Sequence, residues 1–282
     1  MAVRAGLTGS AGSALPRLDK SALARACAPD FIAPQNPAPH TAAILIGSAR
    51  PKGSSTSEAL ARALAANLEQ AGIASRLVYA IAFVKAGRPA EKALADLAGA
   101  ELLIVAAPLY VDGLPYLVGH ALEQLGAHLA PGNSALRQVV GLLNCGFPEA
   151  DHNRSALRVL RTFARANRLL WAGGLAMGAG EIIHGRPLSR FRFVARAQIR
   201  ALRRAASDLA AGHGISREAS RDMARSLLPA WLFRWLAPFK WLLMGHRHGI
   251  GWRRLHARPL AEDPTPTGRE ANVRNYGMPT RR

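Results

Sequence analysis

The sequence predicts an α/β domain built on a doubly wound parallel sheet. From Ala42 onward, short apolar runs alternate with loops rich in Gly, Pro or Ser and with segments of helical periodicity. This alternation is typical of the α/β class. Two of the runs, 102–105 and 139–143, contain only apolar residues and Gly. Strands of this kind are buried on both faces, as in a parallel sheet that is covered by helices on each side.

The alternation places each element of the predicted sheet domain. We expect strands at 42–46, 75–79, 102–106, 139–143 and 169–177. We expect helices at 56–71, 90–98, 115–129, 152–168 and 190–211.

Composition changes along the chain and divides it into three parts. Residues 1–40 are rich in Ala, Pro and Ser without a sustained apolar period, so we interpret them as a flexible leader, with a targeting peptide as the alternative. Residues 41–213 contain the whole alternating pattern and form the sheet domain. Residues 214–282 form a C-terminal extension rich in Trp and Arg.

Charge and cysteine content narrow the classes of partner and location. Lys and Arg number 37 against 18 Asp and Glu, and the net charge of +19 favours an acidic partner such as phospholipid, nucleic acid or a phosphorylated ligand. Cys27 and Cys145 are too few and too far apart for a disulfide framework or a zinc site, which favours the cytoplasm. The apolar stretch 227–245 contains Arg234, Lys240 and two prolines, which disfavours a spanning helix but leaves an interfacial one open.

The loop after the first predicted strand has the composition of a phosphate site. Residues 47–57 supply five hydroxyl side chains, two cations and two glycines. The spacing from Ser55 to Glu58 fits a capping box, which predicts a helix that begins at Thr56 and directs its free N–H groups at the loop. The alternative is a plain helix cap, but a cap does not require the additional hydroxyls and Arg50.

Two established nucleotide motifs do not match this sequence. A Walker loop has four residues between its glycines, whereas five separate Gly47 from Gly53, and Ser54 follows directly. The partial dinucleotide motif at 178–180 lies far along the chain and has Ile183 where a third glycine is required. A P-loop is excluded and a Rossmann dehydrogenase is disfavoured.

Two further loops leave the predicted sheet at the same edge. Residues 107–115 follow the third strand and 144–149 follow the fourth. Loops at the carboxyl ends of parallel strands meet where ligands bind in such sheets. The stretch 107–115, with its Tyr and two Pro, can lay apolar surface along a flat ring, or it is an ordinary turn into a helix.

On these three loops the chain resembles the flavodoxin-like NAD(P)H-dependent FMN reductases and related flavin quinone reductases. The matching motifs are G-S-x-R-x-x-G-S-S, A-P-L-Y-x-D-G-L-P and N-C-G-F-P-E, and the resemblance covers residues 42–211. It implies the strand order 2-1-3-4-5 and non-covalently bound FMN. The implied phosphate contacts are Ser48, Arg50, Ser54, Ser55, Thr56 and Ser57. The implied contacts to the flavin ring are Pro108, Leu109, Tyr110, Val111, Asn144, Cys145, Gly146 and Phe147.

The resemblance implies an oxidoreductase that passes electrons from NAD(P)H through FMN to a quinone, a flavin or a similar small acceptor. The flavin carries that chemistry and the protein supplies position and electrostatics, so no catalytic side chain is expected. Cys145 has no identifiable His or carboxylate partner, which disfavours it as a nucleophile. The strongly basic charge favours an enzyme over the acidic electron carriers of the same fold. The resemblance also implies a homo-oligomer.

Basic surfaces support a second hypothesis from another class. Arginines recur at intervals of three and four in the helices predicted at 152–168 and 190–211, and Glu181 is the only acidic residue from 154 to 204. These faces are either solvated or held against an acidic partner. The Trp, Arg and Lys side chains of 227–258 favour a membrane surface over nucleic acid, with docking on the protein itself or on a second subunit as the alternative. The second hypothesis is a non-catalytic flavodoxin-like module that binds a membrane or polyanion.

Overall fold

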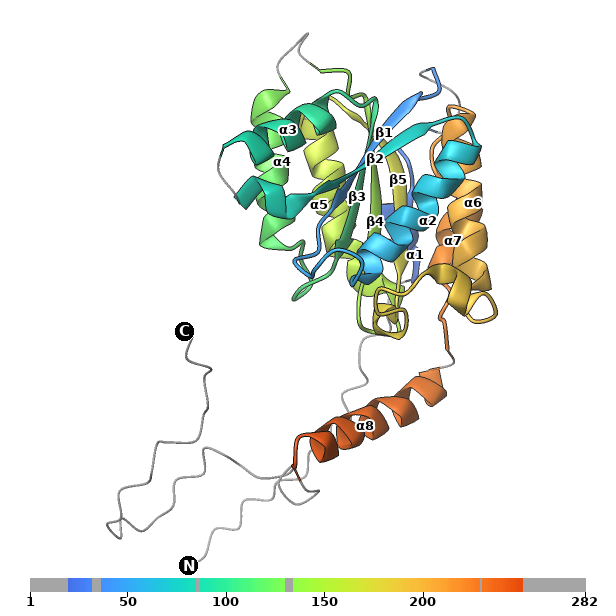
Figure 1. Ribbon diagram of the computed structural model, residues 1–282. Helices are drawn as coiled ribbons and strands as arrows, with labels where there is room; N and C mark the ends of the chain where they lie inside the picture. Colours follow the sequence, from blue (N-terminus) through green and yellow to red (C-terminus); the bar gives the residue numbers. More distant parts are fainter. Residues whose placement is uncertain (1–19, 32–36, 85–86, 130–133, 229, 251–282) are drawn as a thin grey trace, which may run out of the picture. The chain divides into compact units, whose positions relative to one another are not determined.

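The computed structural model describes residues 20–31, 37–84, 87–129, 134–228 and 230–250 (Figure 1). The chain divides into two compact units, one ending at Ala230 and one beginning at Trp231. Each unit is described on its own below.

The first unit is built on one sheet of five parallel strands. The strands are β1 (Thr41–Ile46), β2 (Ala74–Tyr79), β3 (Leu102–Pro108), β4 (Gln138–Asn144) and β5 (Leu170–Met177). Their order is β2-β1-β3-β4-β5, the flavodoxin-like arrangement, which confirms the predicted fold class. Strand order reverses between β1 and β3, so the carboxyl ends of these two strands flank the crevice where such sheets bind ligands.

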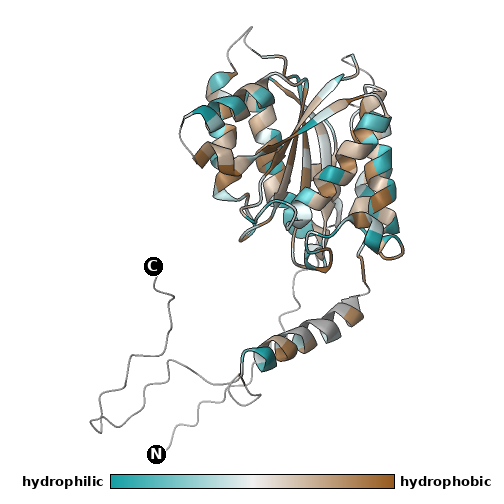
Figure 2. Cartoon of the chain, viewed as in Figure 1, coloured by the Kyte–Doolittle hydropathy of each residue, from teal (hydrophilic) through white to brown (hydrophobic). Residues whose placement is uncertain are grey.

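Helices cover both faces of this sheet. One layer holds α3 (Arg88–Ala98), α4 (Tyr116–His128) and α5 (Arg154–Ala166), and the other holds α2 (Thr56–Gln70), α6 (Arg196–Ala210) and α7 (Arg217–Met223) (Figure 1). Apolar residues concentrate on the strands between the two layers, as Figure 2 shows. Leu45, Ile104 and Val140 have no exposed surface, as expected for strands buried on both sides.

Short 3₁₀ turns lie between the main elements, and two of them delay the start of a predicted helix. They are η1 (Ala80–Val84), η2 (Ala150–Asn153), η3 (Gly180–Ile182) and η4 (Leu188–Phe191). The helix predicted at 152–168 begins only after η2 and ends before Arg168, which has a left-handed φ of 58°. The helix predicted at 190–211 begins at Arg196 because η4 forms a separate turn.

A helix within the predicted leader belongs to the sheet domain. Helix α1 (Lys20–Cys27) packs against β5 and α5, so the prediction of a flexible leader is wrong for residues 20–31. The indole N–H of Trp171 donates to the carbonyl of Ala28 at 3.0 Å, and the N–H of Asp30 donates to the carbonyl of Trp171 at 2.9 Å. Residues 1–19 lie outside the described part of the chain.

The sheet domain also extends beyond the predicted limit at residue 213. The N–H of Ile215 donates to the carbonyl of Ala172 at 2.7 Å. The hydroxyl of Ser220, on α7, donates to the carbonyl of Gly174 at 3.1 Å. Together with the bond from Asp30, these contacts satisfy carbonyl groups along the outer edge of β5. An edge strand that is covered in this way is protected against pairing with another chain.

Several arginines of the predicted basic faces have acidic partners. Arg161 and Arg165 of α5 both pair with Asp30, and Arg200 of α6 pairs with Asp222 at 2.7 Å. More of the positive charge on these two helices is therefore neutralised than the sequence predicts. The partners lie outside the interval 154–204, where a local count of charges cannot find them.

The second unit contains all but the first residue of helix α8 (Ala230–Arg247), which continues through Pro238. Trp235, Phe239 and Trp241 expose roughly two thirds or more of their surface, at 76%, 64% and 68%. No helix in the described part of the chain is long and apolar enough to cross a membrane. Residues 251–258 of the predicted membrane segment lie outside the described residues.

The Asp30 pairs give a testable dependence of stability on pH. Partial burial favours a higher pKa for the Asp30 carboxyl, but the hydrogen bonds and charges of Arg165 and Arg161 outweigh it and hold the pKa below its usual range. Because the folded-state pKa is the lower one, the pairs stabilise the fold above the unfolded-state pKa. That stabilisation is lost as pH falls through the folded-state value.

We therefore expect Asp30→Asn to lower the free energy of unfolding by about 1–2 kcal/mol at neutral pH. The difference from the wild type should be smaller at about pH 3 than at neutral pH, because below the unfolded-state pKa of about 3.9 the charge that the arginines stabilise begins to be lost. Urea unfolding at both pH values measures it, and Glu123→Gln, at an exposed carboxylate with no ion pair among the described residues, is the control. An equal loss at both pH values would contradict the assignment.

Candidate functional site

The predicted loops meet around one pocket of about 90 Å³ at the carboxyl edge of the sheet. Its lining comes from the segments that follow β1, β3, β4 and β5. The lining residues are Ser48, Arg50, Ser55, Thr56, Ser57, Pro108, Leu109, Tyr110, Asn144, Cys145, Gly146, Gly180 and Glu181. Most of the predicted site residues are thus brought together, whereas Ser54, Val111 and Phe147 do not line this pocket.

The start of α2 forms one wall of the pocket. Ser55 is the N-cap of this helix, and its hydroxyl accepts a hydrogen bond from the N–H of Glu58 at 3.1 Å, which confirms the predicted cap. Thr56 and Ser57 are the first two helical residues, whose N–H groups have no acceptor within a helix. These groups and the positive end of the helix dipole make this wall suitable for an anion.

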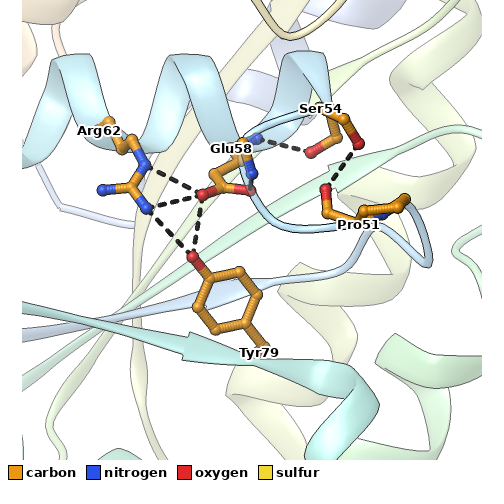
Figure 3. A network of polar contacts seen from close by, with 7 residues as sticks. Pro51, Ser54, Glu58, Arg62 and Tyr79 are labelled. Atoms are coloured by element: carbon orange, nitrogen blue, oxygen red, sulfur yellow. Dashed lines mark hydrogen bonds and ion pairs between the residues drawn. The ribbon is translucent and has the colours of Figure 1, made fainter.

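The hydroxyls of the loop do not all serve the pocket in the same way. Thr56 donates to the carbonyl of Gly180 at 2.8 Å, and Ser57 donates to Oδ1 of Asn144 at 2.7 Å, so both hydroxyls hold neighbouring loops in place. Ser54 donates to the carbonyl of Pro51 at 2.6 Å and closes a turn instead (Figure 3). Ser48 and Ser55 are 6% and 4% exposed, and each hydroxyl oxygen accepts from a backbone N–H but has no acceptor for its hydrogen among the described residues. These two hydroxyls are therefore the ones best able to donate to a ligand.

Two glycines allow neighbouring segments to pack closely on the loop after β1. A Cβ on Gly47 would lie 2.3 Å from Cγ2 of Val118 on α4. A Cβ on Gly185 would lie 2.3 Å from the backbone of Ser54. Any side chain at these two positions would displace the loop from α4 or from the segment after β5.

The cation and the carboxylate of the pocket face one another. Arg50 Nη2 lies 3.7 Å from Glu181 Oε1, and each side chain is about half exposed. Arg50 also approaches the His184 ring at 3.4 Å. Lys52, expected near the same site, instead lies over the ring of Tyr79 at 4.6 Å and does not line the pocket. Sequence reasoning missed Gly180 and Glu181, although their position directly after β5, at the same sheet edge, was a usable signal.

Glu58 holds the loop to the start of α2 through a buried carboxylate (Figure 3). Its side chain is 2% exposed, and Oε2 accepts from the N–H of Gly53 at 2.7 Å. Oε1 accepts from Arg62 at 2.7 Å and from the hydroxyl of Tyr79 at 2.9 Å. Burial opposes ionisation, but the hydrogen bonds from Gly53, Arg62 and Tyr79 prevail and lower the pKa of Glu58. Unlike a standard capping box, this carboxylate reaches Gly53 and not the N-cap N–H.

The loop after β3 contains a strained turn. Val111 and Asp112 have left-handed φ values of 47° and 56°, and the backbone groups of Tyr110 and Gly113 on either side bond to each other at 3.0 Å. A β-branched residue rarely adopts this conformation, and such strain is concentrated at functional sites. The Val111 side chain is fully exposed next to Tyr110, which lines the pocket.

The loop after β4 adds an exposed ring and a buried thiol. Phe147 is 58% exposed and stacks on His152 at 4.5 Å, and His152 lies 3.7 Å from the carboxylate of Asp112, which joins this loop to the previous one. The Cys145 thiol lies 3.3 Å from the carbonyl of Glu149, and burial raises its pKa to about 11. A thiol that stays neutral near pH 7 is a wall of the pocket and not a nucleophile.

The arrangement fits FMN in two parts. The pocket is of a size for a phosphate group, with the Ser48 hydroxyl, the first N–H groups of α2 and Arg50 as donors. It is too small for a flavin ring, which would lie outside it against the exposed side chains of Tyr110, Val111 and Phe147. Glu181 is the one lining group that repels a phosphate, and its proximity to Arg50 offsets that charge.

The Glu58 network predicts how firmly the loop is held. We expect Glu58→Gln to lower the free energy of unfolding by about 2–3 kcal/mol, because hydrogen bonds to a buried charge are lost. We also expect faster hydrogen exchange at the Gly53 amide, because that amide loses its carboxylate acceptor. Urea unfolding and amide exchange measure the two effects. Glu69→Gln, at an exposed position of the same helix, is the control, and an unchanged Gly53 exchange rate would refute the anchoring role.

Comparisons with known proteins find distant structural similarities. No protein-family model matches the chain, and no curated protein matches it significantly. It is similar to an oxidoreductase from Corynebacterium diphtheriae (18% identity, TM-score 0.43, covering 62% of this chain and 97% of that one). It is also similar to the Trp repressor binding protein from Bacillus subtilis (14% identity, TM-score 0.42, covering 60% of this chain and 96% of that one). A third similar structure is an NAD(P)H:quinone oxidoreductase from Methanothermobacter marburgensis (14% identity, TM-score 0.41, covering 61% of this chain and 96% of that one). At these values the similarities say nothing of activity, and the flavodoxin-like fold rests on the strand order itself.

Proposed function

We propose that the protein is an FMN-dependent NAD(P)H oxidoreductase with a quinone, a flavin or a similar small molecule as electron acceptor. The observation that carries the proposal is the pocket at the ends of β1, β3 and β4, where hydrogen-bond donors suited to a phosphate group lie next to exposed apolar side chains. A plain helix cap does not account for a buried Ser48 hydroxyl without an acceptor. An ordinary turn does not account for the strain at Val111.

In this proposal, the chain's own residues bind and orient the cofactor. The Ser48 hydroxyl, the N–H groups of Thr56 and Ser57, and Arg50 hold the phosphate, while Glu58 keeps their loop in place. Bound FMN supplies hydride and electron transfer. The neutral thiol of Cys145 adds no charge to the wall next to the ring.

Exposed apolar side chains around the pocket also support a homo-oligomer. Tyr116, Val111 and Phe147 expose 74%, 102% and 58% of their surfaces on segments near the same sheet edge. A second copy of the chain that covers them would remove this apolar surface from water and enclose a bound ring. The nicotinamide and the acceptor would then share the remaining open face of that ring.

A titration of the full-length protein with FMN tests the cofactor site. We expect a bound-flavin absorbance spectrum, and we expect Ser48→Ala to weaken FMN binding about tenfold, because a donor to a charged phosphate is lost. Ser54→Ala removes the same atom from the same loop but outside the pocket, and should change the affinity less than about twofold.

The activity is then measured as oxidation of NADH and of NADPH by the FMN-loaded protein, with and without a quinone. Folded wild-type protein that does not bind FMN would overturn the proposal. FMN binding without oxidation of either nicotinamide would retain the cofactor site but refute the enzyme.

A second candidate function is attachment to an anionic membrane surface through α8. Trp235, Phe239 and Leu243 lie at intervals of four on this helix and are exposed, as is Arg247 at its end. Aromatic rings together with long cations suit the headgroup region of a bilayer. This function is compatible with the oxidoreductase and does not depend on it.

Vesicle binding tests this attachment. We expect the protein to sediment with vesicles containing phosphatidylserine, and the double variant Trp235→Ser and Phe239→Ser to bind about tenfold more weakly, because buried aromatic surface is lost. Phe193→Ser changes an equally exposed ring in the sheet domain and serves as the control. Equal binding by all three proteins would exclude α8 as the contact.

A further inference from the structure

A second and larger pocket lies outside the candidate flavin site. It has a volume of about 820 Å³ and is lined by α1, α7 and residues 149–151. It shares no lining residue with the smaller pocket. Its volume lies within the range of small-molecule sites.

One side of this pocket is strongly positive. Arg217, Arg221 and Arg225 line it at intervals of four along α7 and just beyond its end. All three are exposed, and Arg217 and Arg221 form no ion pair with any residue in the described part of the chain. Arg225 lies 4.0 Å from Asp222, which is the longest separation of an ion pair. Cations on one face of a helix without acidic partners favour an anion between them.

Two carboxylates line the pocket away from α7. Glu149 is exposed, and the Asp151 side chain is only 10% exposed, with its Oδ2 3.6 Å from Arg154. Oδ1 of Asp151 has less than 1 Å² of accessible surface, so it does not face the open space of the pocket. These two charges repel an anion, so the acidic group of a ligand is favoured at the arginines of α7 and not at residues 149–151.

The remaining wall between these polar groups is apolar. Leu23 and Ala28 line it from the α1 side, and Ile215 and Ala224 line it from the α7 side. A ligand with an acidic group on an apolar body matches this distribution.

We propose that this pocket binds an amphipathic organic anion. Its acidic group lies against Arg217 and Arg221, and its apolar body lies between α1 and α7. This site is independent of the proposed flavin chemistry.

The probe for the test is anilinonaphthalene sulfonate, which carries a sulfonate on an apolar body. We expect it to bind the full-length protein at one saturable site, measured by fluorescence. The double variant Arg217→Gln and Arg221→Gln should weaken binding about tenfold, because the charges that face the sulfonate are lost. Ala24→Trp, at an exposed position that lines the pocket, should abolish binding by filling the space.

Two controls separate this site from unspecific binding and from the flavin site. Arg190→Gln removes an exposed arginine that does not line the pocket, so it should leave the affinity unchanged. FMN should not displace the probe. The proposal is overturned if the wild type does not bind, if binding persists in Ala24→Trp, or if all arginine variants behave alike. Displacement by FMN would also overturn it, because the probe would then occupy the smaller pocket.

Discussion

The position of the first turn of α2 is the constraint on which the candidate site depends. This turn supplies the N–H groups that face the pocket, and two side chains fix it: Ser55 caps it, and the buried carboxylate of Glu58 anchors Gly53. Thr56 and Ser57 then tie the same turn to Gly180 and Asn144, so the segments after β4 and β5 are positioned relative to it. A shift of this turn would therefore disturb every wall of the pocket together.

Local signals in the sequence were sufficient for most of the fold. Runs such as 102–105 predict buried parallel strands because their apolar character is a property of the residues themselves, and the Ser55 cap is likewise a local spacing. The helices α1 and α7 were assigned to the wrong parts because their role is not local. Both are short, and both belong to the domain through bonds to β5, which lies more than 40 residues away along the chain in each case.

The candidate site could be predicted as a set of loops but not as a set of side-chain directions. Parallel topology brings the loops after β1, β3 and β4 to one edge, so loop membership identified most of the lining. The direction in which each side chain points depends on contact partners that the sequence does not reveal. Ser54 turns to Pro51 and Lys52 to Tyr79, whereas Ser48 stays buried in the pocket wall.

The positive charge of the chain could likewise be counted from the sequence, but the place where it acts could not be located. A net charge of +19 favours an acidic partner but does not locate it, and the regular arginines of the helices predicted at 152–168 and 190–211 are one candidate in the sequence. The structure pairs Arg161 and Arg165 with Asp30, so part of that face holds α1 to the domain. Arg217 and Arg221 have no such pairs within the part of the chain that the structure describes, and they border a large pocket. The capacity of the sheet domain to attract an anion is therefore better sought where charge is unpaired than where arginine is most regular in the sequence.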